Sequence, residues 1–414
     1  MEQIWLTAAL WMGLALVAVF IAHWVRLPTA VCEITVGALA PLLLNRWLGP
    51  GMLDPSTPWV VFLAGTGSLL LTFSAGTELD PTVLRATWRE ALLVGLASCI
   101  APLFGTTAAA YYLLGWSAKT AWVTGVCLSS SSVSVVYTIL LEMGINHTGL
   151  GQGLMASSYI NNLFSAIAMG LILAPFNSRT LVLVIVAATI FALLPFISKR
   201  VLGRLRSRVA QPDLRYLLLL LFGLGGLSVS AGGELILPAY IMGMLLAGLV
   251  GRDESLIHHL RVITFGILTP FYFVRAGAQV HVAVLVAAPI VFFTLLAAKL
   301  STKLTGVLPA MRVFAYDRRE GVFCSFMMST GLGLASITAS TGLSRGLLDS
   351  TQYSHIIAAI VGSAVVPVAA ANRWFAPRHL FPQAGEGKAQ KHQTKAKAKA
   401  RNQGKARSAV SSTT

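Results

Sequence analysis

The chain has 414 residues, of which 56% are hydrophobic and only 11% are charged. Soluble domains carry about 25% charged residues, so a deficit along the whole chain excludes an ordinary soluble protein and indicates a lipid environment. The formal net charge of +16 suggests nucleic-acid binding at first sight, but the placement of the cations argues against it.

Long apolar runs follow one another along the chain. A helix needs about 20 apolar residues to cross a bilayer core about 30 Å thick. In chain order, the runs lie near 4–24, 29–46, 58–77, 91–114, 120–141, 152–175, 181–198, 215–231, 235–251, 263–279, 282–305, 320–341 and 353–372. They predict an all-α polytopic membrane protein with about thirteen transmembrane helices. The first run lacks a cleavable signal pattern and is expected to be a true span.

Lysine and arginine gather on alternate loops between these runs. With an outer N-terminus, the inner loops carry Arg26, Arg85, Arg89, Lys199, Arg200, Arg204, Arg206, Arg208, Arg215, Arg252, Arg261, Arg312, Arg318 and Arg319. The outer loops carry only Arg46, Lys119, Arg179 and Arg345. The positive-inside rule therefore predicts a multi-pass protein of the cell (inner) membrane, with its N-terminus outside and its C-terminus in the cytoplasm.

The composition changes near the end of the chain. Residues 1–378 hold all the apolar runs and are expected to form the membrane domain. Residues 379–414 are basic and nearly free of large apolar side chains, which predicts a disordered cytoplasmic tail. We expect this tail to lie near anionic lipid and to help fix the orientation. RNA binding is the alternative, although no aromatic residues interleave the charges of the tail.

An internal similarity relates the two halves of the chain. The similar segments are "RLPTAVCEITVGALAP" (26–41) with "ILPAYIMGMLLAGLVG" (236–251), and "LSSSSVSVVYTI" (128–139) with "MSTGLGLASITA" (328–339). The partners lie an odd number of spans apart, so the second copy enters the membrane from the opposite side. This pattern predicts an inverted repeat of about 26–175 and 235–372, an arrangement typical of secondary transporters.

Two polar stretches interrupt spans at equivalent positions of the repeat, "SSSS" at 129–132 and "STGLG" at 329–333. Consecutive Ser, Thr and Gly weaken a helix, and a bilayer tolerates freed backbone groups only in protein or a wet cavity. We expect two broken helices that cross near the midplane and form a site. The alternative is that these small residues only permit close helix packing.

Asn161 and Asn162 stand side by side in the span that follows "SSSS". An amide offers one carbonyl oxygen to a cation and two N–H donors to unwound backbone. The pair is therefore expected to line the site, and the alternative is interhelical hydrogen bonding without transport.

Four charged residues fall inside the apolar runs. They are Glu33, Arg275, Lys299 and Lys303. Lys299 is expected to snorkel to the inner surface, whereas the position of Lys303 is left open. Arg275 is expected to be functional and to have a partner, and Glu33 is the only carboxylate clearly inside a span. Glu78 and Glu234 lie at span ends, where solvated loop positions are expected.

Nothing in the sequence favours an enzyme. The four cysteines, Cys32, Cys99, Cys127 and Cys324, fall inside spans and are expected to be buried, inert thiols. Metal-ligand spacing is absent, so a zinc or disulfide framework is not predicted. The eight histidines are scattered without a nucleophile nearby, and no cofactor or metal is expected.

Several motifs resemble those of one transporter superfamily. They are "LLTFSAGTELDPTVLRATWREALLVG", "LSSSSVSVVYTILLEMGINHTGLG", "ASSYINNLFSAIAMGLIL", "ILTPFYFVRAGAQV" and "MSTGLGLASITASTGLSRGLLDSTQYSHIIAAIVGSAVVP". Together they resemble the monovalent cation:proton antiporter superfamily, most closely its Kef-type and sodium/hydrogen exchanger branch, over residues 1 to about 378. The resemblance implies an inverted five-helix repeat, a dimerisation domain and a moving core with crossed, unwound helices.

The resemblance also assigns an ion site. By position in the motifs, its residues are Ser131, Ser132, Asn161, Asn162, Thr330 and Lys303. The superfamily normally has an aspartate in the sixth-span pair, most often at the position of Asn162, and many members carry another acid at the position of Leu332. Both positions are neutral in this chain.

The sequence therefore predicts a monovalent cation (Na⁺ or K⁺)/proton antiporter that works by alternating access. Exchange requires one group whose charge differs between loaded and unloaded states, and Glu33 is the remaining candidate for that proton carrier. The alternative for Glu33 is a structural carboxylate held by a nearby donor.

Two other functions stay open. One is a transporter of another solute or an anion, with Arg275 and a lysine as cationic groups, and the other is a non-transporting regulatory membrane protein. The resemblance implies a cation and a proton as substrates, membrane lipid as surroundings and a homodimer, and no nucleic acid.

Overall fold

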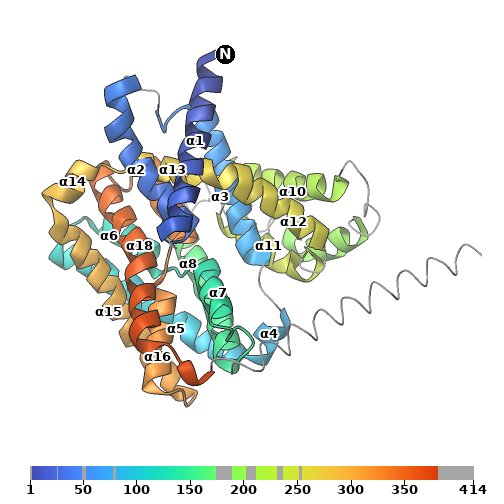
Figure 1. The fold of residues 1–414 in the computed structure, drawn as a ribbon. Coiled ribbons are helices and arrows are strands. Elements are labelled where there is room, and N and C mark those ends of the chain that lie inside the picture. Colours follow the sequence, from blue (N-terminus) through green and yellow to red (C-terminus); the bar gives the residue numbers. More distant parts are fainter. Residues whose placement is uncertain are drawn as a thin grey trace, which may run out of the picture.

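The structure is a computed structural model that describes residues 2–25, 27–48, 53–77, 81–173, 189–201, 211–230, 236–250 and 254–380. All regular structure in these ranges is helical (Figure 1), which confirms the predicted all-α class. Part of the seventh predicted run, the loop residues Glu78 and Glu234, and the tail from residue 381 lie outside the described residues.

The helices coincide with the apolar runs in the described ranges. The first half contains α1 (Glu2–Val25), α2 (Thr29–Leu48), α3 (Pro58–Thr77), α4 (Pro81–Ala86), α5 (Trp88–Ala108), η1 (Ala109–Leu113), α6 (Ala118–Ser129), α7 (Val133–Glu142) and α8 (Gly149–Leu173). The second half contains α10 (Pro212–Ser230), α11 (Ile236–Val250), α12 (Glu254–Ile263), η2 (Thr264–Leu268), α13 (Thr269–Ala278), α14 (Val282–Ala287), α15 (Pro289–Val313), α16 (Arg318–Ser329), α17 (Gly333–Ser344), α18 (Ser350–Ala370), η3 (Ala371–Phe375) and η4 (Arg378–Leu380). Eight helical segments of the described residues are long and apolar enough to cross a bilayer, and the number thirteen remains a prediction.

Two predicted boundaries were wrong. The run 282–305 is divided into α14 and α15 at Ala288, whose φ of −134° and ψ of 62° are not helical. The following Pro289 disfavours helical dihedrals in the residue before it. The run 263–279 begins earlier, at Glu254, because the polar helix α12 continues into the apolar segment that η2 and α13 form. Arg261 therefore lies in a helix instead of an inner loop.

Large apolar side chains cover much of the outer surface. Those of α1 that face outward include Ile4, Trp5, Leu6, Leu16, Phe20 and Trp24. Trp24 is 86% exposed, which water would penalise and lipid favours. Together with the apolar helices, this surface identifies a multi-pass membrane protein.

The helices form two bundles (Figure 1). One contains α5, α6, α8, α15, α16, α17 and α18, in which α5 packs against α6, α8 and α15, and α15 packs against α16 and α18. The other contains α1, α2, α3, α11, α12 and α13, in which α2 packs against α13 and α3 against α11. The contacts between bundles are fewer and involve mainly α8 with α11 and α3 with α17.

The packing follows the inverted repeat. In the repeat, α2 corresponds to α11 and α3 to α13, so the pairs α2–α13 and α3–α11 are equivalent. Both pairs are joined by mutual glycine contacts. A Cβ on Gly37 would lie 2.2 Å from the Val274 carbonyl oxygen, and one on Gly243 would lie 2.2 Å from that of Phe73. Small residues permit such close approach between membrane helices.

This geometry makes Gly243→Ala destabilising. The added methyl group forces α3 away from α11, and we expect a loss of about 1–3 kcal/mol of unfolding free energy, measured by denaturation in mixed micelles. Gly248→Ala in the same helix is the control, because nothing lies within 4 Å of its added Cβ. Equal stability of the two variants would contradict the close α3–α11 contact.

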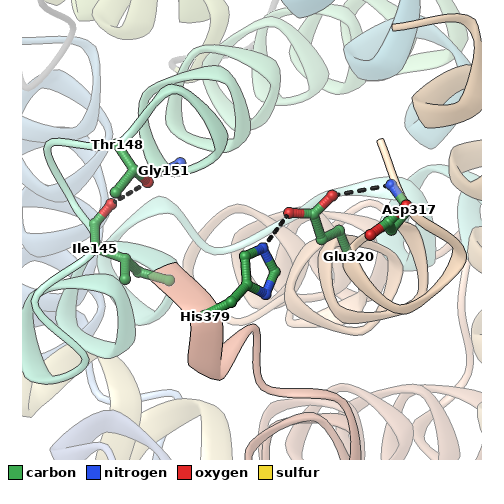
Figure 2. A network of polar contacts seen from close by, with 6 residues as sticks. All are labelled: Ile145, Thr148, Gly151, Asp317, Glu320 and His379. Atoms are coloured by element: carbon green, nitrogen blue, oxygen red, sulfur yellow. Dashed lines mark hydrogen bonds and ion pairs between the residues drawn. The ribbon is translucent and has the colours of Figure 1, made fainter. Parts of the chain in front are cut away.

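Capping interactions hold the first turns of α8 and α16 (Figure 2). The Asp317 N–H donates to Glu320 Oε2 at 2.9 Å, and His379 Nε2 lies 3.1 Å from Glu320 Oε1. At α8, Thr148 Oγ1 donates to the Ile145 carbonyl at 2.7 Å and accepts from the Gly151 N–H at 3.1 Å. The short helix η4, which carries His379, is thereby attached to the beginning of the twelfth predicted span.

Candidate functional site

The two predicted helix breaks are present and meet each other. Residues 130–132 separate α6 from α7, and residues 330–332 separate α16 from α17. The Ser132 N–H donates to the Thr330 carbonyl, and Ser131 Oγ donates to the Met328 carbonyl at 2.7 Å. The fifth and twelfth predicted spans therefore cross at their non-helical residues, which confirms the expected crossing of discontinuous helices.

Hydroxyl groups at the breaks donate to carbonyls of the helical turn that precedes each break. Ser129 Oγ donates to the Val126 carbonyl at 2.9 Å, and Thr330 Oγ1 donates to that of Met327 at 2.6 Å. Ser132 is the N-cap of α7 and accepts from the Val135 N–H. A bilayer requires internal partners for freed backbone groups, so serine and threonine at these positions make the breaks possible.

Asn161 and Asn162 hold the first break from α8. Asn162 Oδ1 accepts from the Ser131 N–H at 3.2 Å. Asn161 Nδ2 donates to Ser98 Oγ at 3.3 Å and to the Ser129 carbonyl at 3.2 Å, while its Oδ1 is buried without a partner among the described residues. Both asparagines thus bond across helices, and the Asn162 carbonyl oxygen expected for a cation is already engaged.

The amine of Lys303 also lies at the first helix break. Its Nζ donates to Ser98 Oγ at 2.8 Å, to the Ser129 carbonyl at 2.7 Å and to Ser131 Oγ at 3.0 Å, and the side chain is fully buried. Ser129 is the last residue of α6, so the amine lies at the negative end of a helix dipole, where a cation is favoured. Ser98 was not among the predicted site residues, and its only signal in the sequence was a hydroxyl group within the apolar run of α5.

The expectation that Lys299 snorkels was wrong. Its side chain is fully buried and its Nζ donates to Ser363 Oγ of α18 at 3.0 Å. A Cβ built on Gly331 would lie 2.6 Å from this Nζ and 2.7 Å from the Ser130 carbonyl oxygen. The lysine turns inward because α18 supplies a hydroxyl partner and the break at Gly331 leaves room for the amine.

A cavity of about 1200 Å³ opens next to the crossing. Its floor includes Ser131, Ser132 and Asn162, and it extends past Glu33 to His23 and Asn372. Thr330 and Lys303 take part in the crossing but do not line the cavity. Most of the remaining lining is apolar, and Glu33 is the only carboxylate among the described lining residues.

Arg275 lies apart from this site. Its Nε donates to the Pro55 carbonyl at 2.6 Å, in the loop between α2 and α3. Hydrogen bonds from the Ser56 hydroxyl and backbone N–H hold the pKa of Asp54, in the same loop, below its usual range, with a smaller contribution from the Arg275 guanidinium. Arg275 therefore has a structural partner in a loop, and an anion-binding role for it at the crossing has no support in the structure.

The contact at Gly331 gives a test of the crossing. In Gly331→Ala, the methyl group collides with Lys299 Nζ and the Ser130 carbonyl, and we expect about 1–3 kcal/mol less stability by micellar denaturation. Gly333→Ala, two residues later, is the matched control, since its Cβ would meet only Leu71 Cδ2 at 3.6 Å. If both variants unfold like the unchanged protein, the two breaks do not touch at residue 331.

Two broken helices that cross beside a cavity, within an inverted repeat, define the class of secondary active transporters. A family model described as "Sodium/hydrogen exchanger, transmembrane" matches residues 12–371. The chain belongs to this sodium/hydrogen exchanger family, which is one of transporters and not of enzymes.

Relatives and solved structures agree with this placement. The chain is 25% identical over 320 residues to "Probable Na(+)/H(+) antiporter 3" of Methanocaldococcus jannaschii, covering 74% of this chain and 81% of the relative. It is 23% identical over 337 residues to "Na(+)/H(+)-K(+) antiporter GerN" of Bacillus cereus, covering 78% and 86%. With "Cation/H(+) antiporter 18" of Arabidopsis thaliana it shares 25% identity over 369 residues, but these span 82% of this chain and only 45% of the relative.

The fold is also similar to that of a solved antiporter. The sodium proton antiporter MjNhaP1 from Methanocaldococcus jannaschii superimposes with a TM-score of 0.69 at 13% identity, over 89% of this chain and 97% of that one. At this identity the similarity shows the fold alone, which is the predicted inverted-repeat antiporter fold.

Proposed function

We propose that the protein exchanges a monovalent cation, Na⁺ or K⁺, for protons by alternating access. The observation that carries the proposal is the crossing of two broken helices on the floor of a cavity that contains one carboxylate, Glu33. The family and the names of its antiporter relatives support the same activity.

Glu33 is the group to which we assign the coupling. Asn161 and Asn162 do not ionise near neutral pH, so they cannot exchange a proton for a cation. Glu33 lies in α2, is buried to 96% of its surface and has no hydrogen-bond partner among the described residues. A carboxylate free of donors can bind either a proton or a cation, and this competition couples the two fluxes.

The remaining site residues have supporting roles in this proposal. Ser131 and Ser132 line the cavity, and their hydroxyl oxygens accept hydrogen bonds from Lys303 Nζ and from the Val135 N–H. Lys303, Asn161, Asn162 and Thr330 hold the crossing together through the hydrogen bonds described above. Arg275 is not part of the transport site.

Exchange in inverted membrane vesicles tests the proposal. After respiration acidifies the interior, added Na⁺ or K⁺ should collapse the pH gradient, as reported by a pH-sensitive fluorophore. Glu33→Gln should abolish the response, because the amide cannot be protonated. Asp213→Asn, at the first turn of α10 and distant from the cavity lining, should leave it unchanged. A response of full size in Glu33→Gln removes Glu33 from the mechanism, and no response to either cation in the unchanged protein removes the exchange itself.

We further propose the membrane arrangement. The N-terminus lies outside and the C-terminus in the cytoplasm of the cell membrane, as the cationic loops indicate, and the repeats span about 26–175 and 235–372. With this orientation the cavity faces the cytoplasm, because it extends to His23 and Asn372 near the C-terminal ends of α1 and η3. Residues 379 and 380 belong to η4 and not to the tail. We also propose that two copies form a dimer, and that the tail beyond Leu380 lies against anionic lipid.

A further inference from the structure

Two buried lysines lie at the helix crossing without an ion-pair partner among the described residues. Lys299 and Lys303 are both fully buried, four residues apart on α15, and neither makes an ion pair with a carboxylate among the described residues. Isolated ammonium groups are expensive to bury unless a negative group is near. Residues 161 and 162 are both asparagines, so they supply no negative group there.

The positive ends of two half-helices face the same cavity. Ser132 and Val133 begin α7, and Leu332 to Leu334 begin α17, and all of these residues line the cavity. The first N–H groups of a helix have no carbonyl partner within it, and the helix dipole favours an anion at this end. The opposite, negative ends are already occupied, because Lys303 and Asn161 donate to the Ser129 carbonyl and Ser131 donates to that of Met328.

The amide of Asn162 also favours an anion in the cavity. Its Oδ1 accepts from the Ser131 N–H, which fixes the orientation of the amide. Its Nδ2 has no hydrogen-bond partner among the described residues and is open to the cavity, although Asn162 is only 5% exposed. The side chain therefore presents two N–H donors, and no acceptor, to whatever occupies the floor.

We propose that a small inorganic anion of the size of chloride binds at this floor, between Asn162 Nδ2 and the N-termini of α7 and α17. Lys303 and Lys299, behind the crossing, add to the positive potential without touching the anion. This site is distinct from the exchange proposed for Glu33 and does not depend on it.

Glu33, His23 and Tyr240 are the titratable groups among the described residues that line the same cavity. An ionised Glu33 opposes the anion, whereas a protonated one does not. Anion binding should therefore be at least as strong in Glu33→Gln as in the unchanged protein.

Thermal unfolding of the purified full chain in detergent tests the site. Sodium chloride is titrated against sodium gluconate at constant ionic strength, and chloride should raise the apparent unfolding temperature until saturation. Asn162→Asp should abolish the shift, because the built-in carboxylate takes the place of the anion. Arg275→Ala removes a cation that bonds to a loop carbonyl outside the cavity, and it should keep the full shift.

The results with chloride and with Asn162→Asp decide whether the anion site exists. No saturable chloride shift in the unchanged protein, or an equal shift in Asn162→Asp, overturns the proposal. If Asn162→Asp does not fold, crystals grown with sodium bromide decide: anomalous density within hydrogen-bond distance of Asn162 Nδ2 supports the site, and its absence there overturns it. These measurements need no transport, so their failure leaves the vesicle result for Glu33 untouched.

Discussion

Lys303→Ala should lower the free energy of unfolding by about 3 kcal/mol, the middle of the range for large-to-small changes of buried side chains. The amine gives three hydrogen bonds to the crossing, and its removal leaves a void and a Ser129 carbonyl that accepts only from Asn161 among the described residues. Denaturation in mixed micelles measures the change.

A second variant separates the effect of lost side-chain volume on stability from the effect of the lost amine. Lys303→Met keeps most of the volume and removes the donors, so we expect it to recover part of the lost stability. The exposed Lys119→Ala, at the beginning of α6, controls for the loss of any lysine. If Lys303→Ala were as stable as Lys119→Ala, the lysine would not be part of the crossing.

Asn162→Asp should create or strengthen proton-coupled cation flux. The carboxylate still accepts the Ser131 N–H, and it places a protonatable negative charge at the positive ends of α7 and α17 on the cavity floor. We expect about a tenfold or larger rise in Na⁺- or K⁺-linked proton movement, corresponding to about 1.4 kcal/mol of differential stabilisation, in the vesicle assay.

The neighbouring position provides the control. Asn161 does not line the cavity, and its Nδ2 donates to Ser98 Oγ and the Ser129 carbonyl. Asn161→Asp exchanges these donors for a buried carboxylate beside a carbonyl oxygen, so it should destabilise the protein without a gain in flux. A gain of flux in Asn161→Asp, with none in Asn162→Asp, would reverse the roles of the two residues.

The sequence predicted the helical class and both breaks because these features depend on local composition. Hydropathy marks the spans, and the hydroxyl groups of Ser129 and Thr330 bond to carbonyls within their own turns. The break before Pro289 was also local, and it was missed because the apolar character continues through it.

What the sequence did not predict depends on partners far along the chain. Lys299 is buried because Ser363 on α18 accepts a hydrogen bond from its amine, and Arg275 is held by a carbonyl 220 residues away. The orientation of the Asn162 amide follows from the Ser131 N–H, a backbone group that composition does not reveal. The distance of Lys299 from the end of its span therefore gave a wrong position for its side chain. For Asn162, the residue type suggested a cation ligand, whereas the structure directs its N–H donors to the cavity.

The paired glycines of the second bundle have a mechanical consequence. Where α2 meets α13 and α3 meets α11, backbone lies directly on backbone, with no rotamers that could readjust during sliding. These four helices should therefore move together as one rigid body. If the bundle that contains α6 and α16 moves relative to the other, the movement has to occur at the smaller contacts of α8 with α11 and of α3 with α17. A cross-link across either contact should hold the protein in one conformation.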